Sequence, residues 1–422
     1  MKRLAFLSIA SVLATGSAAA ECVRGAYTSG KGDFLAVSTP AEGTTGQARY
    51  LFVDGRRGAI GSADALVDCA GESVNVREAD GRTASWKRLP LRETPTTFSS
   101  AATKLTGLLI EPAASNDARP PLVVMVHGSE RRAAIGGVYS YVMAAQGIAT
   151  FVYDKRGTGE SDGEYTQNFE LLADDAAAAL VEGRRLAAGR FGRSGYFGGS
   201  QGGWVAPLAA TRSPADFVTV GFGLVASPID EDREQMLGEA AEAKLDEAAV
   251  ASIKRLSKAT ARIVSSHFTG GFEELERLRR DVAGQPWVEK IQGEYSGDML
   301  RMSDADLRRV GRARFDNLEL IWDYDAVAVL KRLKSPLLWV LAEKDREAPI
   351  EETRAILRKQ IAAGRPIDAY VFPDTDHGMM EFTTNADGSR TITRVTEGYL
   401  RLLADWIKRD LHPPYGRGHA LN

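Results

Sequence analysis

The stretch GGSQGGW, residues 198–204, decides the fold of this chain. It places Ser200 at the centre of the pattern G-x-S-x-G, after an apolar run at residues 193–199 and before a run at residues 201–211 that can continue as a helix. A serine on a sharp strand-to-helix turn exposes its hydroxyl, and flanking glycines are needed because a Cβ there would collide with the neighbouring backbone. Glycine-rich turns also produce this pattern, so the strand and helix on either side are what favour a nucleophile at Ser200.

Four more β-rich runs surround this motif, at residues 121–127, 148–154, 335–342 and 367–373. Most of their residues are apolar, which is typical of parallel strands buried on both faces. Polar residues follow each run, as expected where strands lead into functional loops. An acidic residue, Asp345, follows the third run, and His377 follows the fourth.

The chain order is therefore serine, acid, histidine, with Ser200, Asp345 and His377 as the predicted catalytic residues. A serine hydroxyl is a weak nucleophile at neutral pH, so His377 would accept its proton and Asp345 would orient the imidazole. Asp374 and Asp376 compete with Asp345 for the acid role, although both could be turn residues. The other four histidines do not have the required position.

These ordered signals resemble the α/β-hydrolase superfamily over roughly residues 103–411, and most closely its exported bacterial serine esterases. The prolyl-oligopeptidase-like branch is a nearby relative, although its large propeller has no counterpart in this sequence. The resemblance implies an oxyanion hole that uses the backbone N–H of Gln201 and a second N–H from the loop after His127. Ser129 is the favoured second donor, and Glu130 remains open. The chemistry requires no cofactor and no metal.

The fold class expected from the resemblance is α/β, a mostly parallel sheet flanked by helices, with a helical cap insertion and a small β-rich N-terminal domain. Asp-Gly pairs in the N-terminal part signal antiparallel hairpins. The predicted divisions are a signal peptide at 1–20, the β-rich domain at 21–92, the first part of the core at 93–228, the cap at 229–324, the second part of the core at 325–411 and a flexible tail at 412–422. Aromatic residues of the insertion are expected to form mainly its own core: Phe268, Trp287, Tyr295, Phe315 and Trp322.

The N-terminus predicts export. Lys2 and Arg3 precede a short apolar run, and small residues up to Ala20 form a signal-peptidase site, so the exported chain would be periplasmic or secreted. A membrane anchor is the alternative, but the apolar run is much shorter than the ~20 residues that span a bilayer. Cys22 and Cys69 are the only cysteines, and a disulfide between them is the simplest prediction for an oxidising compartment, with free buried thiols as the alternative.

Composition limits the possible functions. The net charge of −3 and the absence of a basic stripe or a phosphate-binding motif argue against a nucleic-acid partner, and no membrane span is expected in the mature chain. We predict a serine hydrolase that cleaves a small-molecule carboxylic ester. A serine peptidase, aminopeptidase or amidase is the alternative, and a non-catalytic binding protein on the same fold is a third. Glu239 or Glu242 could capture a substrate amine, although solvated helix faces explain both better.

Overall fold

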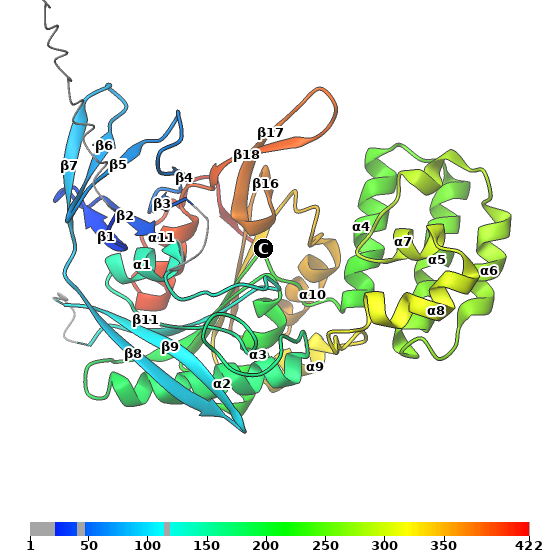
Figure 1. Ribbon diagram of the computed structural model, residues 1–422, viewed down its shortest axis with the longest axis horizontal. Helices are drawn as coiled ribbons and strands as arrows, with labels where there is room; N and C mark the ends of the chain where they lie inside the picture. Colours follow the sequence, from blue (N-terminus) through cyan, green and yellow to red (C-terminus); the bar gives the residue numbers. More distant parts are fainter. Residues whose placement is uncertain (1–21, 40–46, 114–118, 422) are drawn as a thin grey trace, which may run out of the picture.

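The computed structural model describes residues 22–39, 47–113 and 119–421 (Figure 1). The predicted signal peptide at 1–20 lies outside these residues. Three parts follow one another across the longest axis of the molecule: an N-terminal β-sheet, a central α/β core and a separate helical body. Within the described ranges, no helix is both long and apolar enough to cross a membrane.

A nine-stranded sheet forms the core, in the order β19-β15-β14-β13-β12-β10-β11-β9-β8. The six strands from β10 to β15 run parallel, and β8, β9 and β19 are antiparallel to their neighbours. This arrangement confirms the predicted fold class. The strands are β8 (Leu91–Ser100), β9 (Thr103–Pro112), β10 (Leu122–Val126), β11 (Ala149–Tyr153), β12 (Ser194–Gly199), β13 (Phe217–Gly221), β14 (Leu337–Ala342), β15 (Ile367–Phe372) and β19 (His419–Ala420).

Helices cover both faces of this sheet, which is why its central strands are apolar throughout. In β10, Leu122, Val124 and Val126 pack into the core beneath α2, α3, α9 and α10, whereas Val123 and Met125 pack beneath α1 and α11. The helices are α1 (Val138–Ala145), α2 (Phe169–Leu186), α3 (Gly202–Arg212), α9 (Ala326–Arg332), α10 (Glu351–Ala362) and α11 (Tyr399–Lys408).

The N-terminal part is a seven-stranded antiparallel sheet, in the order β4-β3-β2-β1-β7-β6-β5. It has its own core around Tyr27, Phe52 and Trp86, and it packs on α1 of the α/β core. The predicted disulfide between Cys22 and Cys69 is present. The strands are β1 (Gly25–Thr28), β2 (Phe34–Ser38), β3 (Arg49–Phe52), β4 (Arg57–Ala59), β5 (Val67–Ala70), β6 (Ser73–Arg77) and β7 (Thr83–Arg88).

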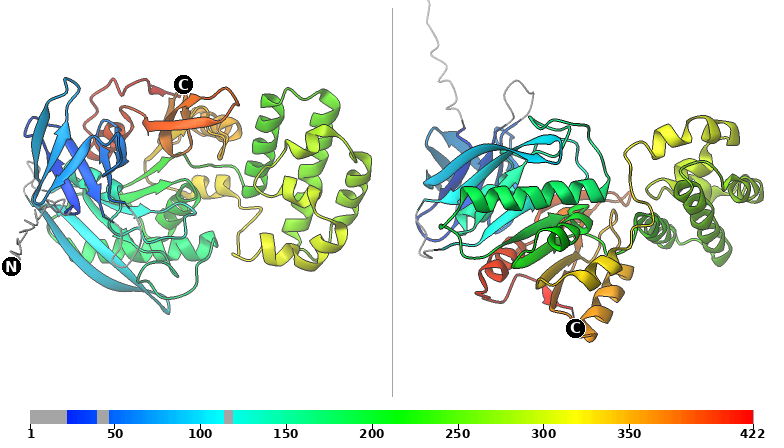
Figure 2. Two further views of the ribbon diagram at one scale, coloured as in Figure 1. Left: turned by 45° about the horizontal axis from the view of Figure 1, so that its top comes forward. Right: turned by 90° about the horizontal axis from the view of Figure 1, so that it is seen from below.

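The helical body lies between β13 and α9 in sequence and stands to one side of the core (Figure 2). Its apolar residues form a separate cluster that includes Trp287, Tyr295 and Trp322, with Phe268 and Phe315 partly buried at its edge. The body contains α4 (Pro228–Glu242), α5 (Glu247–Ser265), α6 (Phe272–Asp281), a 3₁₀ turn at Pro286–Glu289, α7 (Ser296–Arg301) and α8 (Asp304–Phe315). The domain boundaries drawn from the sequence stay a prediction.

Two features of the C-terminal part were not expected from the sequence. A small antiparallel sheet follows β15, made of β16 (Thr375–Asp376), β17 (Met380–Thr384) and β18 (Arg390–Val395), and its hairpin projects from the core (Figure 1). The last residues, predicted as a flexible tail, instead add β19 to the edge of the central sheet, where it pairs with β15. Burial of Tyr415, which is 2% exposed, holds this segment in place.

Candidate active site

Ser200 occupies the turn between β12 and α3, in a left-handed backbone conformation with φ of 53°. Its backbone N–H donates to the carbonyl oxygen of Gly221 at 3.1 Å. The flanking glycines leave no room for a side chain. A Cβ on Gly198 would lie 2.1 Å from the carbonyl oxygen of Gly202, and a Cβ on Gly202 would lie 2.8 Å from that of Val126. The turn therefore exposes the Ser200 hydroxyl, as a nucleophile elbow requires.

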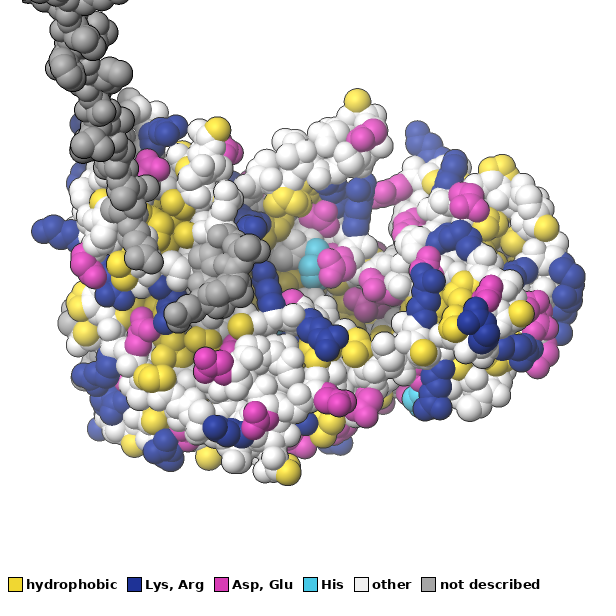
Figure 3. Space-filling model, viewed as in Figure 1, with side chains coloured by type: hydrophobic (Ala, Val, Ile, Leu, Met, Phe, Trp, Pro, Cys, Tyr) yellow, Lys and Arg dark blue, Asp and Glu magenta, His cyan; other side chains and the backbone are white. Residues whose placement is uncertain are grey.

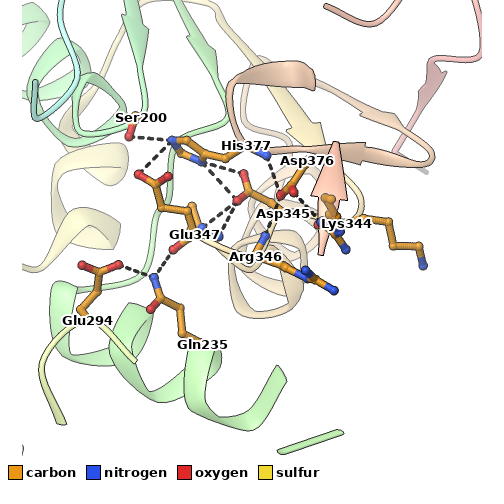
Figure 4. A network of polar contacts seen from close by, with 12 residues as sticks. Ser200, Gln235, Glu294, Lys344, Asp345, Arg346, Glu347, Asp376 and His377 are labelled. Atoms are coloured by element: carbon orange, nitrogen blue, oxygen red, sulfur yellow. Dashed lines mark hydrogen bonds and ion pairs between the residues drawn. The ribbon is translucent and has the colours of Figure 1, made fainter. Parts of the chain in front are cut away.

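His377 and Asp345 come from the ends of β16 and β14 and meet Ser200 at the carboxyl edge of the sheet (Figure 4). The His377 Nε2 atom lies 3.1 Å from the Ser200 hydroxyl oxygen, and its Nδ1 atom lies 3.0 Å from an Asp345 carboxylate oxygen. The second Asp345 oxygen accepts the backbone N–H groups of Glu347 at 3.0 Å and Ala348 at 2.7 Å. This arrangement can transfer the serine proton to the imidazole and stabilise the resulting charge.

The surroundings of His377 favour its charged form. Burial by itself would lower the pKa of His377, but the hydrogen bond to Asp345 and the negative charges of Asp345 and nearby carboxylates raise this pKa above its ordinary value of 6.5. The ring of Phe222 packs edge-on against the imidazole, with 5.1 Å between the ring centroids. The imidazole is therefore oriented from two sides, and its pKa lies above the ordinary value.

The two competing acids do not touch the imidazole. Asp376 accepts the backbone N–H of His377 at 2.9 Å and pairs with Arg390 at 2.6 Å. Asp374 pairs with Arg417 at 2.7 Å on the surface. Asp376 therefore holds a backbone N–H, Asp374 forms a surface ion pair, and Asp345 is the carboxylate that contacts the ring.

His127 has a different role from His377. Its Nε2 atom makes a hydrogen bond with the carbonyl oxygen of Tyr153, which helps to hold the loop after β10. Burial, together with the charge of Lys155, lowers the pKa of His127 to about 4, so the ring is neutral at physiological pH. A buried neutral imidazole bonded to the backbone is a structural group.

The two predicted oxyanion donors line the same cavity as the Ser200 side chain. Within the described residues, the backbone N–H groups of Ser129 and Gln201 donate no hydrogen bond, so both remain available to a substrate oxygen. The loop also lies close to the nucleophile, since a Cβ built on Gly128 would be 3.3 Å from the Ser200 Cβ. The structure thus brings both N–H groups to the cavity of Ser200, and the oxyanion hole itself stays a prediction.

Two side chains that the sequence did not single out hold this loop. The Lys155 ammonium donates to the carbonyl oxygen of Gly128 at 2.7 Å, and the Tyr165 hydroxyl donates to that of Ser129. Lys155 is 3% exposed, and burial lowers its pKa to about 8. The DKRGTGES segment at 154–161 therefore supports the oxyanion loop. Arg156 in the same segment forms a structural ion pair with Asp175 at 2.6 Å.

The Ser200 side chain opens into a cavity of about 270 Å³ between the core and the helical body, which we call the acyl cavity. Figure 3 shows a hollow between the core and the helical body, with acidic side chains and a histidine in it. Aromatic residues form much of its wall: Trp204, Phe222, Tyr295, Phe315 and Trp322. Three of these belong to the insertion, where the sequence predicted mainly core packing. Phe268 and Trp287 stay outside the cavity.

Three carboxylates also line the acyl cavity, and the sequence analysis named none of them: Glu231, Glu294 and Glu347. Burial, followed by the charges of Glu294 and Glu347, raises the pKa of Glu231 well above its usual range. Glu347 lies 3.5 Å from the His377 Nε2 atom (Figure 4). The three acids come from separate segments, so only the position of Glu347, two residues after Asp345, could have drawn attention in the sequence.

The insertion acids considered from the sequence lie elsewhere. Glu239 accepts the backbone N–H groups of Gln292 and Gly293, and Glu242 pairs with Arg346 at 2.8 Å. Across the described part of the chain, no group of three His, Cys, Asp or Glu side chains is placed to hold a metal ion.

Comparison with known proteins identifies the family. Residues 118–380, more than half of the chain, match the family described as serine aminopeptidase, S33. The chain belongs to this serine aminopeptidase S33 family. Membership makes the protein a serine hydrolase of the α/β-hydrolase fold and leaves open whether an ester or a peptide is cleaved. No curated protein matches the sequence.

Several solved structures are similar to this S33 family member at low identity. An acylaminoacyl peptidase of Pyrococcus horikoshii has 15% identity and a TM-score of 0.46 over 90% of this chain and 55% of its own. An esterase of Pyrococcus furiosus has 14% identity and a TM-score of 0.41 over 68% and 83%. A hypothetical protein of Pseudomonas aeruginosa has 16% identity and a TM-score of 0.42 over 76% and 94%. Likenesses this weak say nothing about the bond cleaved.

Proposed function

We propose that the protein hydrolyses a carboxylic acid derivative through an acyl-enzyme on Ser200. His377 accepts the hydroxyl proton as the oxygen attacks, Asp345 keeps the imidazole in the required tautomer, and the N–H groups of Ser129 and Gln201 bind the developing oxyanion. His377 then protonates the leaving group, and water repeats the sequence to release the acid. The hydrogen-bonded series from Ser200 through His377 to Asp345 is the observation that carries this proposal.

The predicted bond is a carboxylic ester of a small molecule. An ester needs nothing beyond the triad and the oxyanion donors, and the aromatic wall of the acyl cavity suits an apolar acyl chain. A cavity of about 270 Å³ limits that chain to a short one.

A second candidate, an aminopeptidase or amidase, is favoured by the carboxylates of the acyl cavity. The Glu231 carboxylate makes no hydrogen bond or ion pair with the described residues, and the Glu294 carboxylate is bonded only by Gln235. Arg314 also lines this cavity, but its guanidinium forms an ion pair with Asp298 at 2.6 Å. Like charges gathered near an apolar wall are costly unless one of them is protonated, as the raised pKa of Glu231 allows, or a cation joins them, and the protonated amine of an aminoacyl group would be such a cation.

The two candidates are separated by comparing 4-nitrophenyl acetate, alanine 4-nitroanilide and N-acetylalanine 4-nitroanilide as substrates of the full chain. Turnover must vanish in Ser200→Ala, and a fluorophosphonate must label wild type at Ser200. Either failure would refute the acyl-enzyme. Cleavage of the acetate alone would support the esterase.

The amine proposal predicts that the free anilide exceeds its acetylated form in kcat/KM by at least about tenfold. Glu231→Gln should reduce this ratio, because a neutral amide cannot pair with an ammonium. Glu242→Gln, on the same helix but outside the cavity, is the matched control. An equal loss in both variants would contradict a specific role for Glu231.

Two further proposals concern the setting of the site. We propose that the helical body acts as a cap, because it supplies one wall of the acyl cavity and could exclude water from it. We also propose that the chain is exported and processed near Ala20, which the disulfide supports because such bonds persist in oxidising compartments. Sequencing the N-terminus of the mature protein tests the export: an intact Met1 on exported material would contradict it.

A further inference from the structure

A second cavity, of about 670 Å³, adjoins His377. Residues of the N-terminal β-rich part and of the β17–β18 hairpin line it together with His377. We call it the hairpin cavity. Its residues are Arg57, Gly58 and Asp64 from the N-terminal β-rich part, Met380, Ile392 and Thr393 from the hairpin, together with Arg346, Glu347, Asp376 and His377. Glu347 lines both cavities, so the two meet at the triad.

The chemistry assigns different parts of the substrate to the two cavities. The acyl group stays on Ser200 during the reaction, and the acyl cavity contains Ser200 with both predicted oxyanion donors. The leaving group takes its proton from the imidazole and therefore departs beside His377. The hairpin cavity contains His377 but not Ser200, which is the position expected for the leaving group.

Contacts between distant parts of the chain fix the wall that carries Arg57. The backbone N–H of Val395 on β18 donates to the carbonyl oxygen of Gly55 at 3.0 Å, and Arg394 donates to that of Asp54. A Cβ on Gly55 would lie 2.0 Å from the carbonyl oxygen of Val395, so this close approach requires glycine. The N-terminal sheet is thereby joined to the hairpin that follows the catalytic histidine.

Most charged groups of the hairpin cavity already have partners of opposite charge. Asp376 pairs with Arg390 at 2.6 Å, Arg346 with Glu242 at 2.8 Å, and Glu347 with His377 at 3.5 Å.

Arg57 differs from these groups. Its guanidinium donates only to the Met380 Sδ atom, at 3.1 Å, and it has no ion pair with any carboxylate of the described residues. A thioether is a weak acceptor, so most of the five N–H donors of Arg57 remain unused. Asp64 also lacks an ion partner among these residues, but it lies on the exposed rim, where salt and water screen its charge.

We propose that the hairpin cavity is the leaving-group subsite and that Arg57 binds a carboxylate carried by the leaving group. A guanidinium and a carboxylate match in a two-pronged geometry that a lone ammonium does not provide. The substrate class is then an acyl compound whose leaving group is itself an acid, such as the ester of a hydroxy acid or an amide whose amine carries a carboxylate. This inference rests on the proposed acyl-enzyme mechanism, and it gives the N-terminal sheet a part in substrate choice.

The test compares two acetate esters that differ only in one group: 4-carboxyphenyl acetate and 4-carbamoylphenyl acetate. Alanyl anilides of 4-aminobenzoate and 4-aminobenzamide form the equivalent amide pair. After correction for the rates with hydroxide, wild type should prefer the acid of either pair by about tenfold or more in kcat/KM. Arg57→Gln should bring the ratio close to one, whereas Arg57→Lys should keep part of it.

Arg56→Gln is the matched control. Arg56 precedes Arg57, but it pairs with Asp54 at 2.8 Å and packs on Phe52, outside the cavity. Its ratio should equal that of wild type. Equal kcat/KM for acid and amide in wild type, or an acid preference that survives Arg57→Gln, would overturn the subsite.

A binding measurement separates this inference from the proposed mechanism. Ser200→Ala should bind the product 4-hydroxybenzoate more tightly than 4-hydroxybenzamide in calorimetry, and adding Arg57→Gln should remove the difference. Binding that depends on Arg57 without any hydrolysis would refute the acyl-enzyme and support the anion site. Hydrolysis that depends on Ser200, without binding that depends on Arg57, would support the acyl-enzyme and refute the anion site.

Discussion

Replacing Asp345 with Asn tests the triad, because the structure fixes how the new side chain must lie. One Asp345 oxygen accepts the backbone N–H groups of Glu347 and Ala348 at 3.0 and 2.7 Å. The amide oxygen of the new side chain must keep this place. An NH₂ group there would leave two buried N–H donors without an acceptor, at a cost of about 2 kcal/mol or more.

In Asp345→Asn, the new NH₂ group would therefore face the Nδ1 atom of His377, which an Asp345 oxygen contacts at 3.0 Å in the wild-type chain. As a donor at the closer of the two oxygen positions, it favours an Nδ1 that accepts, so the ring proton moves to Nε2, the atom that faces Ser200; the retained amide oxygen, 3.2 Å from Nδ1, is the more distant partner. This tautomer cannot take the serine proton. The expected loss is about 10⁴-fold in kcat, or about 5 kcal/mol of transition-state stabilisation.

Hydrolysis of 4-nitrophenyl acetate gives kcat, and thermal unfolding shows whether the variant keeps its fold. Asp374→Asn and Asp376→Asn are the controls, because these acids compete with Asp345 in sequence but do not touch the imidazole. Asp374→Asn should stay near wild type, and Asp376→Asn should lose at most about tenfold, since Asp376 holds backbone N–H groups and Arg390 but does not contact the imidazole. Full activity in Asp345→Asn, or an equal loss in Asp376→Asn, would refute the assignment.

Three other predictions concern charge, packing and the disulfide. Glu347→Gln should move the acid limb of the kcat/KM profile for 4-nitrophenyl acetate to lower pH. The charge of Glu347 raises the pKa of the His377 imidazole, and the imidazole accepts a proton only when it is neutral. An acid limb at the same pH in the variant and the wild type would contradict this. Gly198→Ala should destabilise the fold by on the order of 3 kcal/mol or prevent folding, because the new Cβ would lie 2.1 Å from a carbonyl oxygen. Gly238→Ala is the control, because no atom lies within 4 Å of the position of its Cβ. Equal urea midpoints for the two variants would show that the turn at Gly198 adapts. Reducing the Cys22–Cys69 bond, which spans 47 residues, should destabilise the N-terminal sheet by about 4 kcal/mol. Adding reductant should therefore lower the denaturant midpoint of the wild-type protein. The midpoint of the variant in which both cysteines are replaced by Ser should not change with reductant.

The structure brings Ser200, Asp345 and His377 together as the sequence predicted, because the signals for these residues are local. The elbow at Ser200 depends on a strand, a helix and two glycines within a few residues, and the chain shows these directly. Asp345 and His377 were found because each follows the end of a parallel strand, and such ends lie at one edge of a sheet. The competition with Asp374 and Asp376 could be decided only by the direction of each side chain.

The acidic wall of the acyl cavity could not be predicted in the same way. Glu231 lies at the start of α4, Glu294 in the loop before α7, and Glu347 after β14, so their proximity results from how the helical body sits on the core. Each is an ordinary surface residue by sequence. The acids that the sequence did suggest, Glu239 and Glu242, lie on the same helix as Glu231 but outside the cavity.

The sequence by itself determined the fold class, and it predicted Ser200 as the nucleophile and the order of the proposed triad, because strand periodicity and the steric demands of a tight turn act over a few residues. Tertiary structure alone decided what lies on either side of the triad. Arg57 and His377 are far apart along the chain, yet they line one cavity because the N-terminal sheet packs against the β17–β18 hairpin. Close packing of whole elements creates such neighbours, and no local pattern in the chain records them.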